Sequence, residues 1–148
     1  SAASDVYKRQ GVWNGVNYNL AVMRRYLRSD NPLYRTTADI RMMLYGPSDL
    51  FFNYFAARGI RWAGEKAAVR HLEAHDPAYL ELYLRFLAEP NRQGKFQLYE
   101  QLAALTIEPV GELWEDGDTI MMVDTPEVTP ELEQQALDFW EALVGSPS

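Results

Sequence analysis

The sequence predicts an all-α fold, an antiparallel bundle of five to six helices with a short extended or hairpin segment near residues 113–123. Apolar residues recur at helical spacing along most of the chain, and N-capping residues with Pro or Gly separate the helical stretches. The connections are short, which favours antiparallel packing of neighbouring helices. With 47% apolar and 13% aromatic residues, the 148-residue chain can bury one ordinary core.

The first two expected helices lie on either side of residues 30–32. The first has one apolar stripe, formed by Val16, Leu20, Met23 and Leu27. Asn31 is a good N-cap, and Pro32 suits the first turn of the next helix. The inward face of this second helix is expected to carry Leu33, Thr37, Ile40 and Leu44. Gly46-Pro47 interrupts the pattern, which resumes at Leu50, Phe51, Tyr54 and Phe55 and stops at Gly59, so one kinked helix or two helices in series are expected.

Four more stretches complete the expected bundle. A third helix covers about Trp62 to Ala74, with Ala68, Val69 and Leu72 inward. Asp76-Pro77 begins a fourth, whose inward residues are Leu80, Tyr83, Leu84 and Leu87. A fifth runs from about Arg92 to Ile107, with Leu98, Leu102 and Leu105 in phase. After a turn and a β-prone run at 114–123, Thr129-Pro130 caps a last helix with inward Leu132, Ala136, Phe139 and Leu143.

Residues 1–10 are expected to be a non-native or disordered leader, and residues 11–145 to be a single helical domain. The leader shows no helical period, and its residues 5–10 resemble a translated sequencing-adapter remnant. On this interpretation the chain is the C-terminal fragment of a longer protein.

Charge and composition disfavour several classes of function. The net charge of −7 disfavours broad binding to nucleic acid. Two small basic clusters, Arg24/Arg25/Arg28 and Arg35/Arg41, are interpreted as solvated helix faces. The absence of cysteine excludes a disulfide scaffold and a cysteine nucleophile, and it fits a cytoplasmic location. No apolar run is long enough to span a membrane.

Two sequence patterns contain chemically reactive residues. His71 and His75 share one helix face, but a zinc site needs three protein ligands, so no metal site is predicted. Arg70 and His75 form an Arg-x(4)-His pattern that is similar to the signature of the HEPN ribonucleases. The resemblance implies that Arg70 and His75 would assist attack of an RNA 2′-hydroxyl and stabilise the phosphorane.

Asp116-x-Asp118 could hold Mg²⁺ as a carboxylate pair on a strand, but it is interpreted as a solvated turn. The sequence contains no Gly-rich phosphate-binding loop and no Gly-x-Ser-x-Gly nucleophile motif.

Four stretches carry a broader resemblance, namely residues 13–20, 61–79, 86–89 and 105–111. Together they resemble the helical C-terminal domain of bacterial nucleotidyltransferase-domain proteins, which are relatives of the aminoglycoside adenylyltransferases. The resemblance covers most of residues 12–115 as a diffuse pattern. It implies an N-terminal domain with Gly-Ser and Asp-x-Asp motifs, Mg²⁺ and a nucleoside triphosphate, and a helical domain that shapes the acceptor pocket.

The resemblance also implies roles for particular residues. Trp62, Glu65 and Lys66 would face the cleft, with Lys66 on nucleotide phosphates and Glu65 orienting or deprotonating an acceptor hydroxyl. Tyr54 joins Trp62 and Lys66 as an expected substrate-binding residue, since a phenol offers apolar area and one hydrogen bond. The alternative is that Glu65 only complements the helix dipole and Lys66 pairs with a surface acid.

The leading interpretation is therefore the substrate-side helical domain of a nucleotidyltransferase, inactive alone. Its partners would be an upstream or separate nucleotidyltransferase domain and a small-molecule or protein acceptor. The alternatives are a HEPN-type ribonuclease using Arg70 and His75, and a non-catalytic protein-interaction bundle. The sequence leaves homodimerisation open.

Overall fold

The computed structural model describes residues 2–116 and 129–144, and all regular structure within them is helical, as predicted. The helices are α1 (Ala2–Arg28), α2 (Pro32–Ile40), the π-helical turn η1 (Arg41–Tyr45), α3 (Gly46–Ala57), α4 (Glu65–His75), α5 (Pro77–Ala88), α6 (Arg92–Ile107) and α7 (Pro130–Val144). Residues 111–115 form no regular structure, and the rest of the expected hairpin, from 117 to 123, lies outside the described residues. No helix in the described part of the chain is long and apolar enough to cross a membrane.

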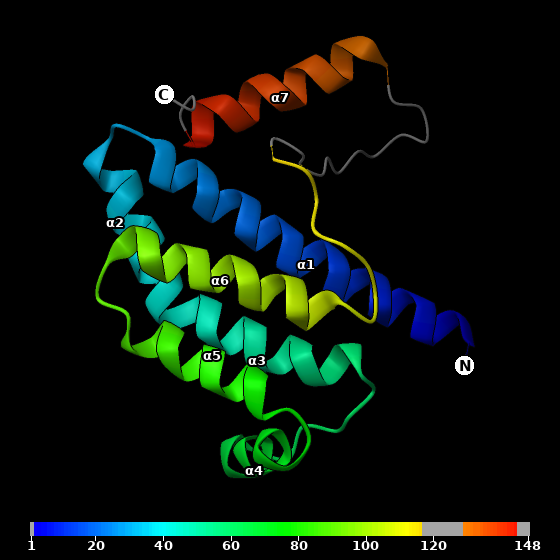
Figure 1. Ribbon diagram of the computed structural model, residues 1–148. Helices are drawn as coiled ribbons and strands as arrows, with labels where there is room; N and C mark the ends of the chain where they lie inside the picture. The colour runs from blue at the N-terminus through cyan, green and yellow to red at the C-terminus, as the bar shows by residue number, and fades with distance from the viewer. Residues whose placement is uncertain (1, 117–128, 145–148) are drawn as a thin grey trace.

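The core of the bundle lies between α1, α3, α5 and α6. Figure 1 shows α6 running alongside α1 and α3, while α4 lies across one end of the bundle next to α5. Large side chains from all four core helices are fully buried, among them Leu20, Leu50, Tyr79, Phe86, Tyr99 and Leu102. The α1 stripe is confirmed, because Val16, Leu20 and Met23 are buried and Leu27 packs partly buried against the core.

The predicted capping residues begin their helices. Asn31 and Asp76 accept hydrogen bonds from the backbone N–H groups of Leu33 and Tyr79, at 3.0 and 3.2 Å. Thr129 Oγ1 accepts from the backbone N–H of Leu132 at 3.1 Å. Gly59 ends the helical run of α3 with a φ of 66°, in the left-handed region that favours glycine. The capping residues found in the sequence therefore predicted these helix boundaries correctly.

The expected inward face of α2 and η1 is wrong. Leu33, Ile40 and Leu44 are 64%, 41% and 57% exposed. The buried positions of this stretch are instead Ala38 and Met42, followed by Gly46 at the start of α3. At Gly46 the reason is close packing, because an added Cβ would lie 2.8 Å from a ring carbon of Tyr99. The expected inward residues of α3, namely Leu50, Phe51, Tyr54 and Phe55, are all buried.

Three other expected core faces are partly wrong. Leu84, Leu87 and Leu105 are exposed, while Tyr79 and Phe86 take the buried face of α5, since aromatic rings bury more apolar area. On α7, Phe139 is exposed, whereas Leu132 and Ala136 are partly buried. The side chain of Leu143 lies outside the described residues.

Residues 2–10 continue α1 as exposed helical turns, so the expected boundary between a leader and the domain at residue 10 is absent from the backbone. A helix surrounded by solvent needs no apolar face, which explains why the sequence shows no period there. The foreign origin of this stretch stays a prediction.

Candidate functional site

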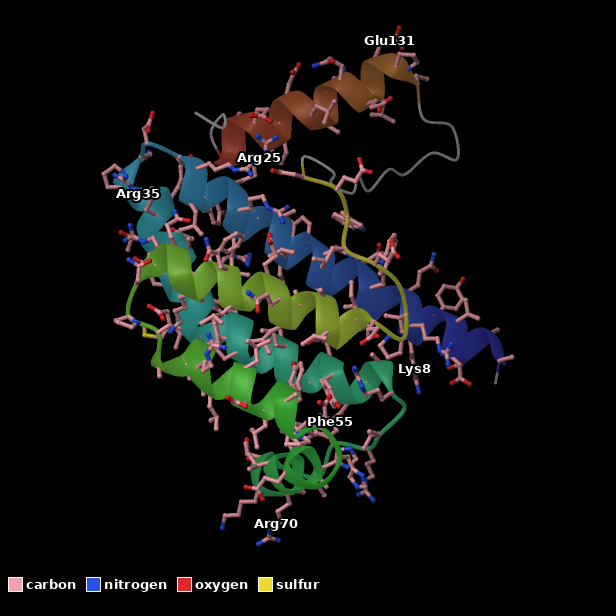
Figure 2. The ribbon with its side chains drawn as sticks, in the orientation of Figure 1. Lys8, Arg25, Arg35, Phe55, Arg70 and Glu131 are labelled. Carbon is pink, nitrogen blue, oxygen red and sulfur yellow. The ribbon has the colours of Figure 1, made fainter. Side chains whose placement is uncertain are left out.

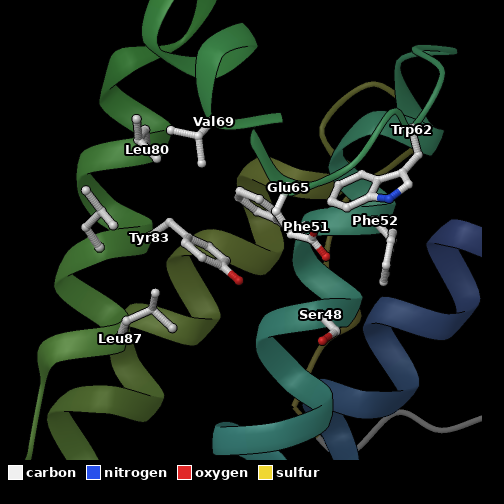
Figure 3. Close-up of a pocket in the computed structure, with 10 residues that line it drawn as sticks. Ser48, Phe51, Phe52, Trp62, Glu65, Val69, Leu80, Tyr83 and Leu87 are labelled. Carbon is white, nitrogen blue, oxygen red and sulfur yellow. The ribbon is translucent and has the colours of Figure 1, made fainter. Parts of the chain in front are cut away.

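An apolar groove lies between α3, α5, the start of α4 and the segment before it. We call it the α3–α5 groove. Its volume is about 280 Å³, and it is lined by Ser48, Phe51, Phe52, Trp62, Glu65, Val69, Leu80, Tyr83, Leu84 and Leu87. Figure 3 shows Phe52, Trp62 and Ser48 on the α3 side and Val69, Leu80 and Leu87 on the opposite side.

Trp62 is held in place by aromatic contacts. Its ring centroid lies 4.4 Å from that of Phe52 and 5.9 Å from that of Phe51, both in edge-on arrangements. A third edge-on contact joins Trp62 to Phe55 at 5.7 Å. These contacts make Trp62 a fixed part of the groove wall, although it belongs to the irregular connection between α3 and α4.

Glu65 is the acidic residue of the groove and the first residue of α4. Gly64 precedes it with a φ of 97°, a conformation that L side chains rarely adopt, and turns the chain into the helix. The unpaired N–H groups of the first helical turn favour a carboxylate at this position. Glu65 is exposed and makes no hydrogen bond or ion pair with any residue that the structure describes.

Tyr83 forms the floor of the groove together with Phe51. Their rings stack with centroids 4.5 Å apart. The Tyr83 hydroxyl donates a hydrogen bond to the carbonyl oxygen of Pro47 at 2.8 Å. Burial raises the pKa of Tyr83 to about 12, so the phenol is neutral at physiological pH. Because this hydroxyl proton is hydrogen-bonded to the Pro47 carbonyl oxygen, Tyr83 is not free to donate to a ligand.

The structure brings together two of the predicted site residues, Trp62 and Glu65. Lys66 follows Glu65 on α4 and is exposed, outside the groove lining. Tyr54 lies elsewhere: it is 3% exposed, its hydroxyl donates to Asp76 at 2.7 Å, and the Arg58 guanidinium covers its ring at 3.7 Å. Tyr54 therefore links α3 to the N-cap of α5 and does not reach the groove.

Arg70 and His75 occupy exposed positions on α4, and Figure 2 shows Arg70 pointing away from the bundle. Five residues correspond to about 140° around a helix, so the two side chains leave different faces. His75 instead contacts His71, with ring centroids 4.5 Å apart, and His71 packs on Phe55. In the described part of the chain no three His, Cys, Asp or Glu side chains form a group that could hold a metal ion.

The three arginines in the last two turns of α1 are paired with acids, which sequence reasoning did not foresee. Arg24 binds Glu100 at 2.7 Å, Arg25 binds Glu141, and Arg28 binds Asp116. The hydrogen bond from Arg28 holds the pKa of the Asp116 carboxyl below its usual value. Asp116 is thus an ion-pair partner and not a free turn residue, while Asp118 lies outside the described residues.

Sequence reasoning missed eight of the ten groove residues, and three of them illustrate why. Leu84 and Leu87 were assigned to the core because they share the helical period of α5, and Phe52 was given no site role. The available signal was an excess of apolar positions: α5 carries more large apolar residues than one buried face can hold.

Comparisons with protein-family models, with curated proteins and with solved structures found no match for this chain.

Proposed function

We propose that this chain is the substrate-side helical domain of a nucleotidyltransferase, and that the α3–α5 groove holds the acceptor. The observation that supports this proposal most strongly is the joint position of Trp62 and Glu65 on one groove. The family resemblance assigns both residues to the acceptor side of the cleft. An apolar concavity with a few converging polar groups is also the usual form of a small-molecule site.

The proposed reaction divides the chemistry between two domains. The acceptor hydroxyl attacks the α-phosphorus of a nucleoside triphosphate, a new P–O bond forms, the α–β anhydride bond breaks, and pyrophosphate leaves. Glu65 orients the hydroxyl or takes its proton. Lys66, one residue further on α4 and exposed to solvent, would meet the phosphates.

Mg²⁺ and the nucleotide would belong to the catalytic domain. Protein-bound Mg²⁺ is usually held by one or two carboxylates together with substrate phosphates, and the groove offers one carboxylate but no group that would bind phosphate. The lining also lacks a basic residue for phosphate. These residues do not fit Mg²⁺, so no metal step is assigned to this chain.

The proposal is tested with the gene and its full product. The coding region around this segment, or a neighbouring gene, should encode Gly-Ser followed by Asp-x-Asp. With Mg²⁺ and an α-labelled nucleotide, the complete system should label an acceptor. Glu65→Gln should lower kcat by about 10²–10⁴-fold if Glu65 is the base. Glu73→Gln, the same substitution at an exposed position of the same helix, is the matched control. Absence of the motif and of transfer would refute the proposal.

A second candidate function, a protein-interaction bundle, is favoured by a separate observation. The exposed side of α2 and η1 presents five large apolar side chains, namely Leu33, Ile40, Met43, Leu44 and Tyr45. Large exposed apolar patches often mark interaction sites. If this surface joins two copies of the chain, sedimentation equilibrium should show a dimer that Leu44→Glu converts to monomer. A wild-type chain that stays monomeric would contradict self-association.

A further inference from the structure

We infer that the α3–α5 groove selects a small organic cation, with an apolar or aromatic body and one ammonium group besides the acceptor hydroxyl. This inference rests on the proposed function in one respect, that the groove is a ligand site. It adds the chemical class of the ligand, which neither the resemblance nor the reaction supplies.

The size and the lining of the groove favour an apolar body. Its volume of about 280 Å³ lies just below the range of drug-sized pockets, about 300–1,000 Å³. Six of the ten lining side chains are hydrocarbon, namely Phe51, Phe52, Val69, Leu80, Leu84 and Leu87. A ligand rich in hydroxyl groups would lose hydrogen bonds to water there and find few replacements.

The polar groups in the lining favour one positive charge. Glu65 lies at the groove without a partner among the described residues, and none of the lining side chains is basic. The Tyr83 hydroxyl donates its proton to the Pro47 carbonyl oxygen, so it is not available to donate to a ligand. An ammonium group beside the acceptor hydroxyl would pair with the Glu65 carboxylate, which then orients the acceptor and does not take its proton. An anionic ligand would be repelled by the same carboxylate.

The aromatic rings reinforce this preference. Figure 3 shows Glu65 extending over α3 among the side chains of Phe51, Phe52 and Trp62. The faces of aromatic rings carry negative electrostatic potential and attract cations, with tryptophan the strongest. An ammonium group at the carboxylate is therefore placed next to these rings as well. The pairing with Glu65 and the contact with the aromatic rings both favour the cation over neutral and anionic analogues of the same ligand.

The test uses three probes with the same phenyl body on the intact chain. They are 2-phenylethylammonium, the neutral 2-phenylethanol and the anionic 3-phenylpropionate. Chemical-shift changes of the backbone amide and Trp indole N–H signals in two-dimensional NMR locate each probe, and titrations give its Kd. Glu65→Gln removes the charge while keeping the shape, and Glu73→Gln removes an exposed charge from the same helix without touching the groove.

We expect the ammonium probe to shift Trp62 and its groove neighbours and to bind about fivefold or more tightly than the alcohol. Glu65→Gln should abolish this preference, Glu73→Gln should preserve it, and added salt should reduce it. Phe52→Leu, which keeps an apolar but non-aromatic wall, should weaken the ammonium probe about two- to fivefold.

Four results would overturn the inference. The first three are equal binding of ammonium and alcohol, a preference that survives in Glu65→Gln, and no groove shifts with any probe. The fourth is tighter binding of spermidine, as an additional probe, than of 2-phenylethylammonium in the groove, because the apolar body would then be unnecessary. None of these results bears on the Gly-Ser and Asp-x-Asp motifs or on nucleotide transfer, so failure here is distinguishable from failure of the proposed function.

Discussion

A buried hydroxyl pair joins three helices at the centre of the bundle. The Tyr79 hydroxyl of α5 and the Thr106 hydroxyl of α6 lie 2.7 Å apart, and both side chains are buried. The Leu50 carbonyl oxygen of α3 lies 3.4 Å from the same Tyr79 hydroxyl. Burial raises the pKa of Tyr79, which keeps the phenol neutral. The pair satisfies polar groups that would otherwise be costly in the core.

Thr106→Val should lower the free energy of unfolding by about 1–3 kcal/mol, because it leaves the Tyr79 hydroxyl with only a long hydrogen bond. Urea denaturation followed by circular dichroism measures this loss. Thr36→Val, on the exposed side of α2, is the control and should change stability by no more than about 0.5 kcal/mol. Equal losses of unfolding free energy in the two variants would show that the buried hydroxyl pair stabilises the fold no more than an exposed threonine does.

Asp49 is a partly buried carboxylate near the start of α3. Burial raises its pKa, although Arg41 acts in the opposite direction. A raised folded-state pKa means that ionisation costs more in the folded than in the unfolded protein. Stability is therefore lost as the pH rises from below the unfolded value, near 3.8, through the folded pKa.

Asp49→Asn should consequently raise the melting temperature at pH 7, while the Asn19 amide can still donate to the new side chain's carbonyl oxygen. Below about pH 3.8 both residues are neutral and the gain should vanish. Thermal melts at pH 7 and pH 3 give the comparison. A gain of the same size at both pH values, or a loss at pH 7, would contradict the assignment of burial as the dominant cause.

At the scale of elements, helix boundaries follow from local chemistry, whereas the buried face of α2 and η1 does not. Asn31, Asp76, Asn91 and Thr129 cap the helices that follow them, and such caps can be found in the sequence. The buried line of α2, η1 and α3 instead follows from close approach to α1 and α6. Ala38 and Gly46 are buried because they are small, which a search for apolar periodicity does not detect.

Gly46→Ala should destabilise the protein by about 1–3 kcal/mol, since its Cβ would lie 2.8 Å from Tyr99 Cε2 and 3.0 Å from the Arg41 carbonyl oxygen. Gly15→Ala on α1 is the matched control, because its Cβ meets nothing within 4 Å. That control should stabilise by about 0.5–1 kcal/mol through the better helix propensity of alanine. Chemical denaturation of both variants tests the contrast, and a neutral Gly46→Ala would show that the junction is loosely packed.

At the scale of the whole molecule, contacts between distant segments create the features that sequence reasoning missed. Trp13 Nε1 donates to the Glu112 carbonyl oxygen at 2.7 Å, and the Trp114 backbone N–H donates to Asn17. These bonds fix the chain after α6 against α1. Likewise Arg24, Arg25 and Arg28 pair with Glu100, Glu141 and Asp116, so this basic cluster is neutralised by acids from elsewhere. No local pattern reveals such pairing.

Only the part of the candidate site whose residues are close in sequence could be predicted. Trp62 and Glu65 are three residues apart, and the family resemblance alone implies that both face a cleft. Leu84 and Leu87 come from α5, and their role as the opposite wall depends on how α5 packs beside α4. Tyr54 is buried and is not part of the groove lining, and its sequence did not reveal this because an aromatic residue suits a core and a groove equally well.

The most direct test of the proposed function is a steady-state transfer assay on the full gene product with Leu87→Trp, which fills the α3–α5 groove from its exposed wall. The account predicts a KM for the acceptor raised about tenfold or more, about 1.4 kcal/mol, with the KM for the nucleotide unchanged. Unchanged kinetics for the acceptor, in a variant that folds normally, would contradict the groove as the acceptor site.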